Sequence, residues 1–411
     1  MRQYSIDGNL YAEDDNRLQA VLARIHTSKS RPLCLCARPG VPMYVSKVAG
    51  HYVIKRMPDS GADHSADCDS YDPPAQLSGL GEVLGHAIKE DVEDGTTVLK
   101  LAFALNKIAG RAPPSASDSE QGSITADSTK LTIRSLLHYL WDQSHLTHWN
   151  PGMLGRRSWA TVHKYISRAA QDKVTKGMDL PSRLYVPEPW YVDRKDDIAQ
   201  RRSALLAQAA TSDRSGQKLF IVVGEVKEVV AARYGRKMVL KQVPDFFFML
   251  SDELNKKLKV FQSEFSLWTA FDEIHLMTIA TFSVDSAGLA QVEEMALMVT
   301  NEHWIPFASV DEKNLIESLI TNGRRFVKGL RYNMPSSRPL ASVVLSDTEP
   351  KQTAVYLVPA SASDDYMTAL GDLTADFKFE HVQWLGGDRM PDLPRSARAA
   401  PLHSTGLESA G

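Results

Sequence analysis

The placement of the cysteines constrains the fold of this chain more than any other feature. All three of them, Cys34, Cys36 and Cys68, fall within one short stretch, and His64 stands four positions before the last. The pattern C-x-C followed by H-x-x-x-C offers three thiolates and one imidazole, a standard tetrahedral ligand set for structural zinc. Three cysteines are too few for a disulfide scaffold. The spacing therefore predicts a zinc site formed by Cys34, Cys36, His64 and Cys68.

The segment between the two ligand pairs predicts the local fold. Residues 43–48 and 52–56 are strand-like, and Ala49-Gly50 between them is typical of a hairpin turn. A hairpin between two ligand pairs is the arrangement of a zinc ribbon, and four protein ligands leave no open position, so the site should be structural. Two alternatives stay open: three free cysteines packed as small apolar side chains, or an iron–sulfur cluster with one histidine ligand.

Composition along the chain predicts an α+β fold with several domains. A segment rich in Pro, Ser, Ala, Asp and Gly separates the first domain from the rest, and the C-terminal end has a similar composition. The predicted units are a zinc-ribbon-containing α+β domain at 1–110, a flexible linker at 111–129, a helical and β-hairpin domain at 130–303, an α/β unit at 304–385 and a disordered tail at 386–411.

The domain at 130–303 begins with a pattern that nucleic-acid-binding proteins share. Apolar residues at helical spacing predict helices at 131–141 and 158–174, with a turn at 150–152 between them and a short strand at 182–187 after them. Helix, turn, helix, strand is the order of a winged-helix domain, although many other α+β folds have it too. Further strands are expected at 219–226 and 237–243, around a turn at Tyr234-Gly235.

Charge and hydropathy exclude several classes of protein. With 47 Lys and Arg against 50 Asp and Glu, the net charge is −3, which excludes a uniformly basic protein that coats nucleic acid. No apolar run approaches the ~20 residues that span a bilayer, and the N-terminus lacks the apolar core of a signal peptide. We therefore expect a cytoplasmic protein without membrane contact, whose reduced thiols are available to a metal.

Two local blocks are nevertheless strongly basic. Residues 154–176 carry six Lys or Arg against one acid, and residues 324–331 carry four and none. Lys and Arg on a helix contact DNA phosphates in helix-turn-helix proteins, although a charged helix face is often only solvated. The candidate nucleic-acid contacts are Arg156, Arg157, Lys164, Arg168, Arg324, Arg325, Lys328 and Arg331.

Evidence for a catalytic site is weak. Restriction-endonuclease-like cores place an Asp at one strand end and E-x-K on the next strand, so that two carboxylates hold Mg²⁺. Residues 304–385 resemble that core loosely through Asp347, but the following strand lacks E-x-K. Glu225 and Lys227 do form E-x-K, with Asp245 following, in the reverse order. These four residues are the candidates for a metal-dependent nuclease, and no phosphate-binding or hydrolase motif is present.

Three blocks of the sequence resemble an uncharacterised bacterial family, domain of unknown function eleven-seventy-three. They are PLCLCARPGVPMYV with the later RMPDSGADHSADC, LLHYLWDQSHLTHWNPGMLGRRSW, and RRFVKGLRY. The resemblance implies a setting on conjugative plasmids and integrative elements, and carries no established activity. The leading hypothesis is a zinc-stabilised accessory protein of a mobile element that binds DNA or a nucleoprotein complex without catalysis. The alternatives are a nuclease or its inactive relative, and a protein-interaction scaffold.

Overall fold

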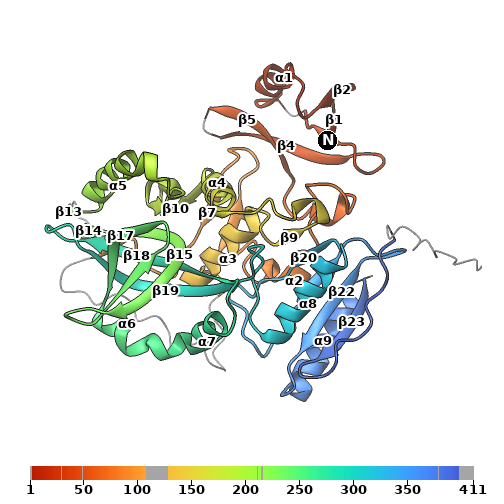
Figure 1. The fold of residues 1–411 in the computed structure, drawn as a ribbon. Coiled ribbons are helices and arrows are strands. Elements are labelled where there is room, and N and C mark those ends of the chain that lie inside the picture. The colour runs from red at the N-terminus through yellow and green to blue at the C-terminus, as the bar shows by residue number, and fades with distance from the viewer. Residues whose placement is uncertain are drawn as a thin grey trace, which may run out of the picture.

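The computed structural model describes residues 2–28, 30–48, 50–107, 128–210, 212–213, 216–377 and 379–397. Within these ranges the chain is a mixed α+β protein with several sheets (Figure 1), as predicted. Most of the predicted linker at 111–129 and the end of the predicted tail lie outside the described residues. No helix in the described ranges is long and apolar enough to cross a membrane.

The N-terminal unit is a small antiparallel sheet covered by one helix. Leu18, Leu22 and Ile25 follow the helical repeat and are the buried residues of that helix, which packs on the sheet. The sheet has the order β2-β1-β3-β4-β5. Its elements are β1 (Gln3–Ile6), β2 (Asn9–Ala12), α1 (Leu18–Ile25), β3 (Leu33–Cys34), β4 (Val41–Val48) and β5 (His51–Arg56).

The middle of the molecule is organised around a buried helix, α3 (Ile133–Gln143). Thr132 caps this helix by accepting a hydrogen bond from the backbone N–H of Ser135, and Leu136, Leu140 and Trp141 are fully buried. The same part of the chain also forms a short sheet in the order β11-β10-β7-β6 and three further helices. These elements are α2 (Ala75–Ser78), β6 (Ile88–Glu90), β7 (Thr97–Leu99), α4 (Trp159–Ala170), β10 (Lys173–Thr175), β11 (Met178–Asp179) and α5 (Lys195–Ala209).

The largest element of the fold is a closed five-stranded barrel, on the left in Figure 1. Its strands follow one another in the order β15-β16-β17-β19-β18, and β18 pairs back with β15. All neighbours are antiparallel except β17 and β19, which are parallel. The elements are β15 (Phe220–Ala231), β16 (Arg236–Leu240), β17 (Val243–Leu250), α6 (Asp252–Lys257), α7 (Gln262–Ala270), β18 (His275–Val284) and β19 (Ala290–Thr300). β12 (Leu184–Tyr185) adds a parallel strand beside β15.

Strand β15 explains the long apolar run in this part of the sequence. Phe220 and Val222 point into the barrel, whereas Ile221 and Val223 belong to the core shared with α3. Because both faces of the strand are buried, apolar and polar residues do not alternate. A Cβ at Gly224 would lie 2.7 Å from Leu240 Cδ1, so a larger residue here would displace the side chain of Leu240.

A third sheet, in the order β23-β22-β21-β20-β9, forms the C-terminal part. Apart from β9 (His148–Trp149), its elements come from the predicted C-terminal unit. They are α8 (Val310–Thr321), β20 (Phe326–Lys328), β21 (Val343–Leu345), β22 (Thr353–Val358), α9 (Asp364–Asp376) and β23 (Glu380–Leu385).

Hydrogen-bonded strands connect the segments that the sequence predicts as separate domains. β9 joins 130–303 to the C-terminal sheet, and β7 pairs with β10 across the predicted linker. β8 (Asn106–Lys107) likewise pairs with β14 (Gly216–Lys218), which continues from β13 (Ser212–Asp213).

The first part of the predicted disordered tail is packed against the protein. Met390 and Leu393 contact the large hydrophobic core, and the Ala397 N–H donates to the carbonyl of Asp347 over 2.8 Å. These two apolar side chains hold a Pro-rich segment in place. Residues 386–397 of the predicted tail therefore have contacts with the rest of the protein.

Candidate metal centre

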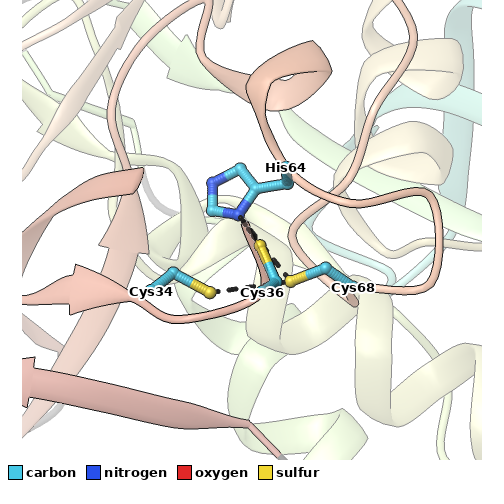
Figure 2. A group of neighbouring side chains, drawn as sticks. All are labelled: Cys34, Cys36, His64 and Cys68. Carbon is cyan, nitrogen blue, oxygen red and sulfur yellow. Dashed lines mark hydrogen bonds between the residues drawn. The ribbon is translucent and has the colours of Figure 1, made fainter. Parts of the chain in front are cut away.

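The four predicted metal ligands meet at one place (Figure 2). Sγ of Cys34 lies 3.7 Å from Sγ of Cys68, and Nδ1 of His64 lies 3.2 Å from Sγ of Cys36 and 3.7 Å from Sγ of Cys68. All four ligand atoms lie within 4.8 Å of one another. Ligands at ~2.0–2.3 Å from a tetrahedral metal are separated by about 3.5–3.8 Å. The cluster therefore has the size and donor set of a tetrahedral metal site.

The first ligand pair is held by the N-terminal sheet. Cys34 ends β3, where it pairs with Tyr4 of β1 on one side and Val41 of β4 on the other. The chain then turns through Cys36 and reaches Gly40, whose φ of +124° disfavours any other residue. The strand and the turn together direct both thiols to the same point.

The second ligand pair lies on a loop that closes on itself. Gly61 accepts a hydrogen bond from the N–H of Asp72 over 3.2 Å, and a Cβ on Gly61 would lie 2.7 Å from the Cβ of Asp72. Only glycine permits this close approach. His64 and Cys68 stand within the loop, where the Cys68 N–H donates to the carbonyl of Ser65 in a tight turn. The hairpin β4–β5 lies between this loop and the first ligand pair, as the spacing predicts.

The surroundings of the cluster stabilise thiolate sulfur. Backbone N–H groups of Ser65 and Ser70 donate to Sγ of Cys36 and Cys68, each over 3.4 Å. The hydrogen bond from Cys34 lowers the pKa of Cys68 to about 5, and the same bond, with burial, raises the pKa of Cys34. A metal ion would replace the proton that these two thiols share.

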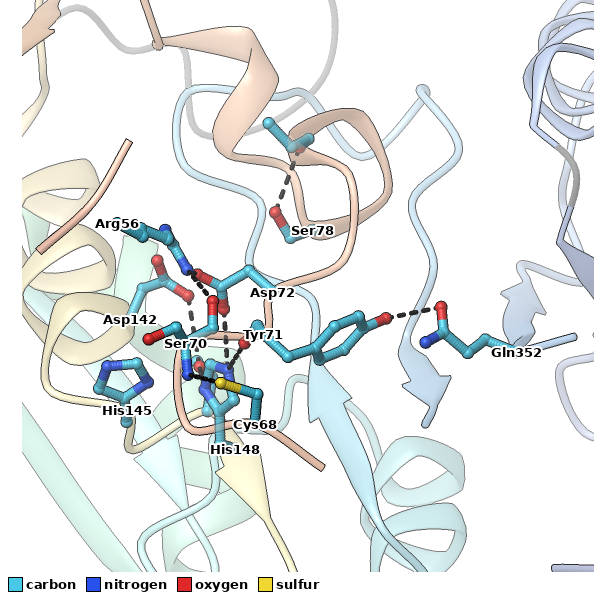
Figure 3. A network of polar contacts seen from close by, with 12 residues as sticks. Arg56, Cys68, Ser70, Tyr71, Asp72, Ser78, Asp142, His145, His148 and Gln352 are labelled. Carbon is cyan, nitrogen blue, oxygen red and sulfur yellow. Dashed lines mark hydrogen bonds and ion pairs between the residues drawn. The ribbon is translucent and has the colours of Figure 1, made fainter. Parts of the chain in front are cut away.

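The ligand loop also attaches the N-terminal unit to the rest of the molecule (Figure 3). The carboxylate of Asp72 forms an ion pair with Arg56 of β5 and accepts a hydrogen bond from Nε2 of His148 at 2.8 Å. On its other side, His148 Nδ1 lies 3.2 Å from the hydroxyl of Thr147, which contacts Asp142 of α3. Burial lowers the pKa of His148 to about 4. The neutral imidazole, with its proton on Nε2, is the form that donates to Asp72.

Two further contacts bind the same loop to the C-terminal sheet. The hydroxyl of Tyr71 donates to Gln352 over 2.8 Å, and Asp67 pairs with Arg325 at 3.1 Å. The candidate metal ligands thus alternate along one short segment with docking residues, which are those that contact the rest of the molecule: Asp67, Tyr71 and Asp72. Sequence reasoning missed the docking residues, because nothing in the spacing between positions 72 and 148 indicates that they pair.

The first basic block is divided between the interior and the surface. Arg156, Lys164 and Arg168 are exposed along α4 and just before it. Arg157 is instead turned inward, where its guanidinium donates to backbone carbonyls that include those of Leu146 and His303. Burial lowers its pKa to about 10. Its donors thus bind carbonyls of the loops around it, and its predicted phosphate contact stays untested.

The second basic block is largely internal. Arg324 is buried and forms a two-pronged ion pair with Asp347, at 2.9 and 2.8 Å. Lys328 is buried against Glu312 at 2.7 Å. The remaining two cations of the block are also engaged, Arg325 with Asp67 and Arg331 with the carbonyls of Pro335 and Arg338. The four cations of this block thus already have partners within the protein, and their predicted contact with nucleic acid stays untested.

The candidate catalytic residues do not form a common site. Glu225 contacts Lys241 at 2.6 Å and His275 at 2.7 Å; burial raises its pKa, but these two groups outweigh burial and leave it below its usual value. Asp245 pairs with Arg202 at 2.6 Å, Asp347 with Arg324, and Lys227 is exposed. Among the described residues, the only metal-sized cluster of His, Cys, Asp and Glu is the Cys/His site. The structure does not bring the four nuclease candidates together, and the nuclease alternative itself stays untested.

One surface feature was visible in the sequence and was not interpreted there. The turn between the first two barrel strands carries Arg233, Tyr234 and Arg236, and Lys237 follows directly. The structure leaves the first three of these residues exposed, with Tyr234 76% exposed. Alternation of aromatic and cationic residues at a hairpin turn is the signal that could have identified this surface.

Comparison with known proteins identifies the family of the chain. No curated protein and no solved structure matched it. The family described as "Protein of unknown function (DUF1173)" matches residues 4–387, which include all four ligands and the three blocks of sequence that carry the resemblance. The chain therefore belongs to the DUF1173 family.

Proposed function

We propose that this protein is a zinc-stabilised DNA-binding protein that does not catalyse a reaction. Zinc is the metal that the site favours, because three thiolates and one imidazole at tetrahedral separations suit it, and four protein ligands leave no position for a substrate. The site then acts as a zinc-ribbon-like structural centre. A reducing compartment such as the cytoplasm keeps the thiols available. The mobile-element context is carried over from the family resemblance.

The exposed face of α4 is the observation that carries the proposal. No acidic residue occurs from position 154 to 171, and Arg156, Lys164 and Arg168 are exposed there. Val162 and Ile166 on the opposite side are fully buried, so the helix is held rigidly with its cations outward. α3, α4 and the antiparallel β10–β11 hairpin have the chain order of a winged-helix unit. In such a unit α4 would be the helix that contacts the duplex.

The dispersal of the carboxylates supports a function without catalysis. Glu225, Asp245 and Asp347 each lie against a different cation, which removes the paired negative charge that two-carboxylate magnesium sites require. We expect no cleavage of plasmid DNA in the presence of Mg²⁺ or Mn²⁺.

Duplex binding measured against salt tests the proposal. The affinity of the full-length protein for a labelled duplex should fall steeply between ~50 and ~200 mM salt. The double substitution Lys164→Ala with Arg168→Ala should weaken binding and reduce the salt slope by about 2, one for each lost phosphate contact. A matched control is Lys89→Ala with Lys100→Ala, which removes two exposed cations from another face. Absent or salt-insensitive binding, or equal loss in the control, would reject the proposal.

The metal assignment has its own measurement. Elemental analysis of the purified protein should find about one equivalent of zinc, as four ligands around one ion require. A content below about half an equivalent, or a stoichiometric content of iron, would reject zinc as the resident metal.

A further inference from the structure

The strand order of the barrel defines a known kind of binding scaffold. Counted along the chain, its strands neighbour one another in the order first, second, third, fifth, fourth and again first, with the third and fifth parallel. Helices α6 and α7 connect the third strand to the fourth. This is the topology of an oligonucleotide/oligosaccharide-binding (OB) fold, whose ligands lie across the second and third strands between two loops. Because a fold does not determine a function, the function has to be inferred from the residues on that face.

The outward face of the second and third strands presents an aromatic ring and a cation. Met238 and Phe248 point into the barrel core, so their neighbours Lys237 and Phe247 point outward. Phe247 is 42% exposed, and the Lys237 ammonium lies 3.7 Å from the centre of its ring. Val239, the cross-strand partner of Phe247, is buried. This face therefore presents an exposed aromatic ring directly beside a cation.

The two loops that border the OB-fold ligand lie at the ends of this face. The loop between the first and second strands, 232–235, carries Tyr234, which is 76% exposed, with the Arg233 guanidinium 5.4 Å from its ring centre. The loop between the fourth and fifth strands, 285–289, ends at the exposed Leu289. The register joins them, because Met249 of β17 pairs with Lys237 on one side and Gln291 on the other. Loop, strand pair and loop therefore form one continuous surface.

The segment from residue 227 to 241 has an excess of cations, which suits a polyanion. It contains five cations, Lys227, Arg233, Arg236, Lys237 and Lys241, and one acid, Glu228; of these cations, Lys241 is paired with Glu225. The local net charge of 5 − 1 = +4 contrasts with −3 for the whole chain. In Figure 1 the barrel lies on the side of the molecule away from the N-terminal unit.

We infer that the barrel face formed by Tyr234, Lys237 and Phe247 binds single-stranded DNA. Unstacked bases lie on exposed aromatic rings, and the phosphates between them pair with nearby cations. A duplex keeps its bases stacked and hidden, so it cannot use the rings of Phe247 and Tyr234. The choice of DNA over RNA rests on the proposed function, in which α4 contacts DNA. The barrel adds a second site, on different residues, for a strand that has left the duplex.

The test uses the zinc-loaded full-length protein and a labelled oligothymidylate of about 20 nucleotides, enough to cross one OB fold. Replacing both rings, Phe247→Ala with Tyr234→Ala, should raise the Kd at least ~10-fold, because each stacked base contributes strongly. Duplex affinity should change less than ~2-fold, since the duplex does not reach these rings. Both side chains are exposed, so the thermal unfolding of the double variant should match that of the parent protein.

Matched variants separate this surface from α4. Tyr191→Ala removes an aromatic ring that is 46% exposed outside the barrel, and should leave oligothymidylate binding unchanged. Lys164→Ala with Arg168→Ala should weaken duplex binding more than single-strand binding. Photo-crosslinking of an iododeoxyuridine oligonucleotide should label a peptide within residues 232–250.

Each contrary outcome has a distinct meaning. Duplex binding that depends on α4, with single-strand binding absent or unaffected by loss of the two rings, would overturn the barrel inference and leave the proposed function standing. Absence of all DNA binding by folded protein would overturn both. Tighter binding of oligouridylate than of oligothymidylate would overturn the assignment to DNA, and crosslinks confined to α4 would overturn the assignment to the barrel.

Discussion

The N-terminal unit and the barrel are both built mainly from antiparallel strands, yet different forces hold them together. The core of the N-terminal unit has nine buried apolar residues, among them Cys34 itself. The barrel closes on itself and shares two much larger cores with α3, α8 and the C-terminal sheet. The N-terminal sheet is open, and its helix α1 has only eight residues.

This difference explains why the metal ligands are found where they are. Small units bury too little apolar surface to offset the conformational entropy lost on folding, and metals commonly supply the missing stability. The barrel needs no such cross-link, because Phe220, Phe248 and Phe282 pack against one another inside it. A metal bound at the proposed site would therefore stabilise the one of these two regions whose core is smaller.

Removal of the metal should produce the largest difference in stability between the N-terminal unit and the barrel. Cys68→Ser, or chelation of the wild-type protein, should unfold residues 30–72, because structural zinc contributes ~10–16 kcal/mol of apparent binding free energy in small zinc domains. Hydrogen exchange measured by mass spectrometry should show rapid exchange in β3, β4 and β5. The barrel strands should keep their protection.

Ser65→Ala is the matched control for metal loss. This residue lies in the same loop, but it contributes only its backbone N–H to Cys36, and alanine keeps that group. Its exchange pattern should equal that of the wild type. If Cys68→Ser left the hydrogen-exchange protection of β3 to β5 unchanged, the metal would not stabilise the N-terminal unit. If the barrel lost protection at the same time, the two regions would not be stabilised separately.

The barrel should instead respond to a cavity. Phe248 is fully buried and meets Phe282 edge-on, with ring centres 5.3 Å apart. Phe248→Ala should lower the free energy of unfolding of the barrel by about 3–5 kcal/mol. Phe247→Ala, at the adjacent but exposed position, should cost less than about 1 kcal/mol. Urea unfolding followed by exchange of barrel peptides measures both; equal losses would mean that Phe248 is not in a tight core.

The same two regions show what the sequence could and could not predict. The ligand set was predictable because thiolate and imidazole chemistry resides in the residue types themselves, and the hairpin between the pairs has a short local signal at its turn. Helices α1, α3 and α4 were predictable from their apolar repeat. The local sequence could not show that Arg157 turns toward backbone carbonyls while its neighbour Arg156 faces solvent, since both belong to one run of charge.

The closure of the barrel was not predictable for a physical reason. Residues 237–243 look like one strand, but the chain reverses at Lys241 and Gln242, and the run Phe246-Phe247-Phe248 lacks the alternation that marks a half-buried strand. The pairing of β17 with β19 is parallel and joins positions about 40 residues apart, Phe248 with Ala290. Such long-range pairing leaves no periodic trace in the sequence.

Acid should affect the helical layer that supports the barrel. Burial lowers the pKa of His138 to about 3, and its Nδ1 accepts a hydrogen bond from the Tyr332 N–H, so the folded protein holds it neutral. The unfolded chain protonates histidine near pH 6.5, so it binds more protons than the folded state between pH ~6.5 and ~3. Stability is therefore complete above this window and falls as the pH drops through it, by about 1.4 kcal/mol per pH unit for each such histidine.

His138→Gln isolates this contribution, because the glutamine amide can accept the same hydrogen bond without titrating. The slope of barrel stability against pH gives the number of protons taken up on unfolding. Between pH ~4.5 and ~5.5 this number should decrease by about one. His51→Gln provides the exposed control. An unchanged slope in His138→Gln would show that this imidazole is charged or solvated in the folded protein.

The smallest expected effect concerns the junction between the two regions. Tyr71 is buried and donates its hydroxyl to Gln352 over 2.8 Å, which links the ligand loop to the C-terminal sheet. Tyr71→Phe should lower the free energy of unfolding by about 0.5–1.5 kcal/mol, the net value of one hydrogen bond, without releasing the metal.

A double-mutant cycle with Gln352→Ala measures the coupling energy between Tyr71 and Gln352, which should be at least about 0.5 kcal/mol. The lost hydrogen bond should appear as faster hydrogen exchange in residues 64–72 alone. The metal would still hold the loop on one side, and the contacts of Asp72 with Arg56 and His148 would hold it on the other. Zero coupling would mean that the contacts of Asp72 with Arg56 and His148 attach the N-terminal unit without any contribution from the hydrogen bond between Tyr71 and Gln352.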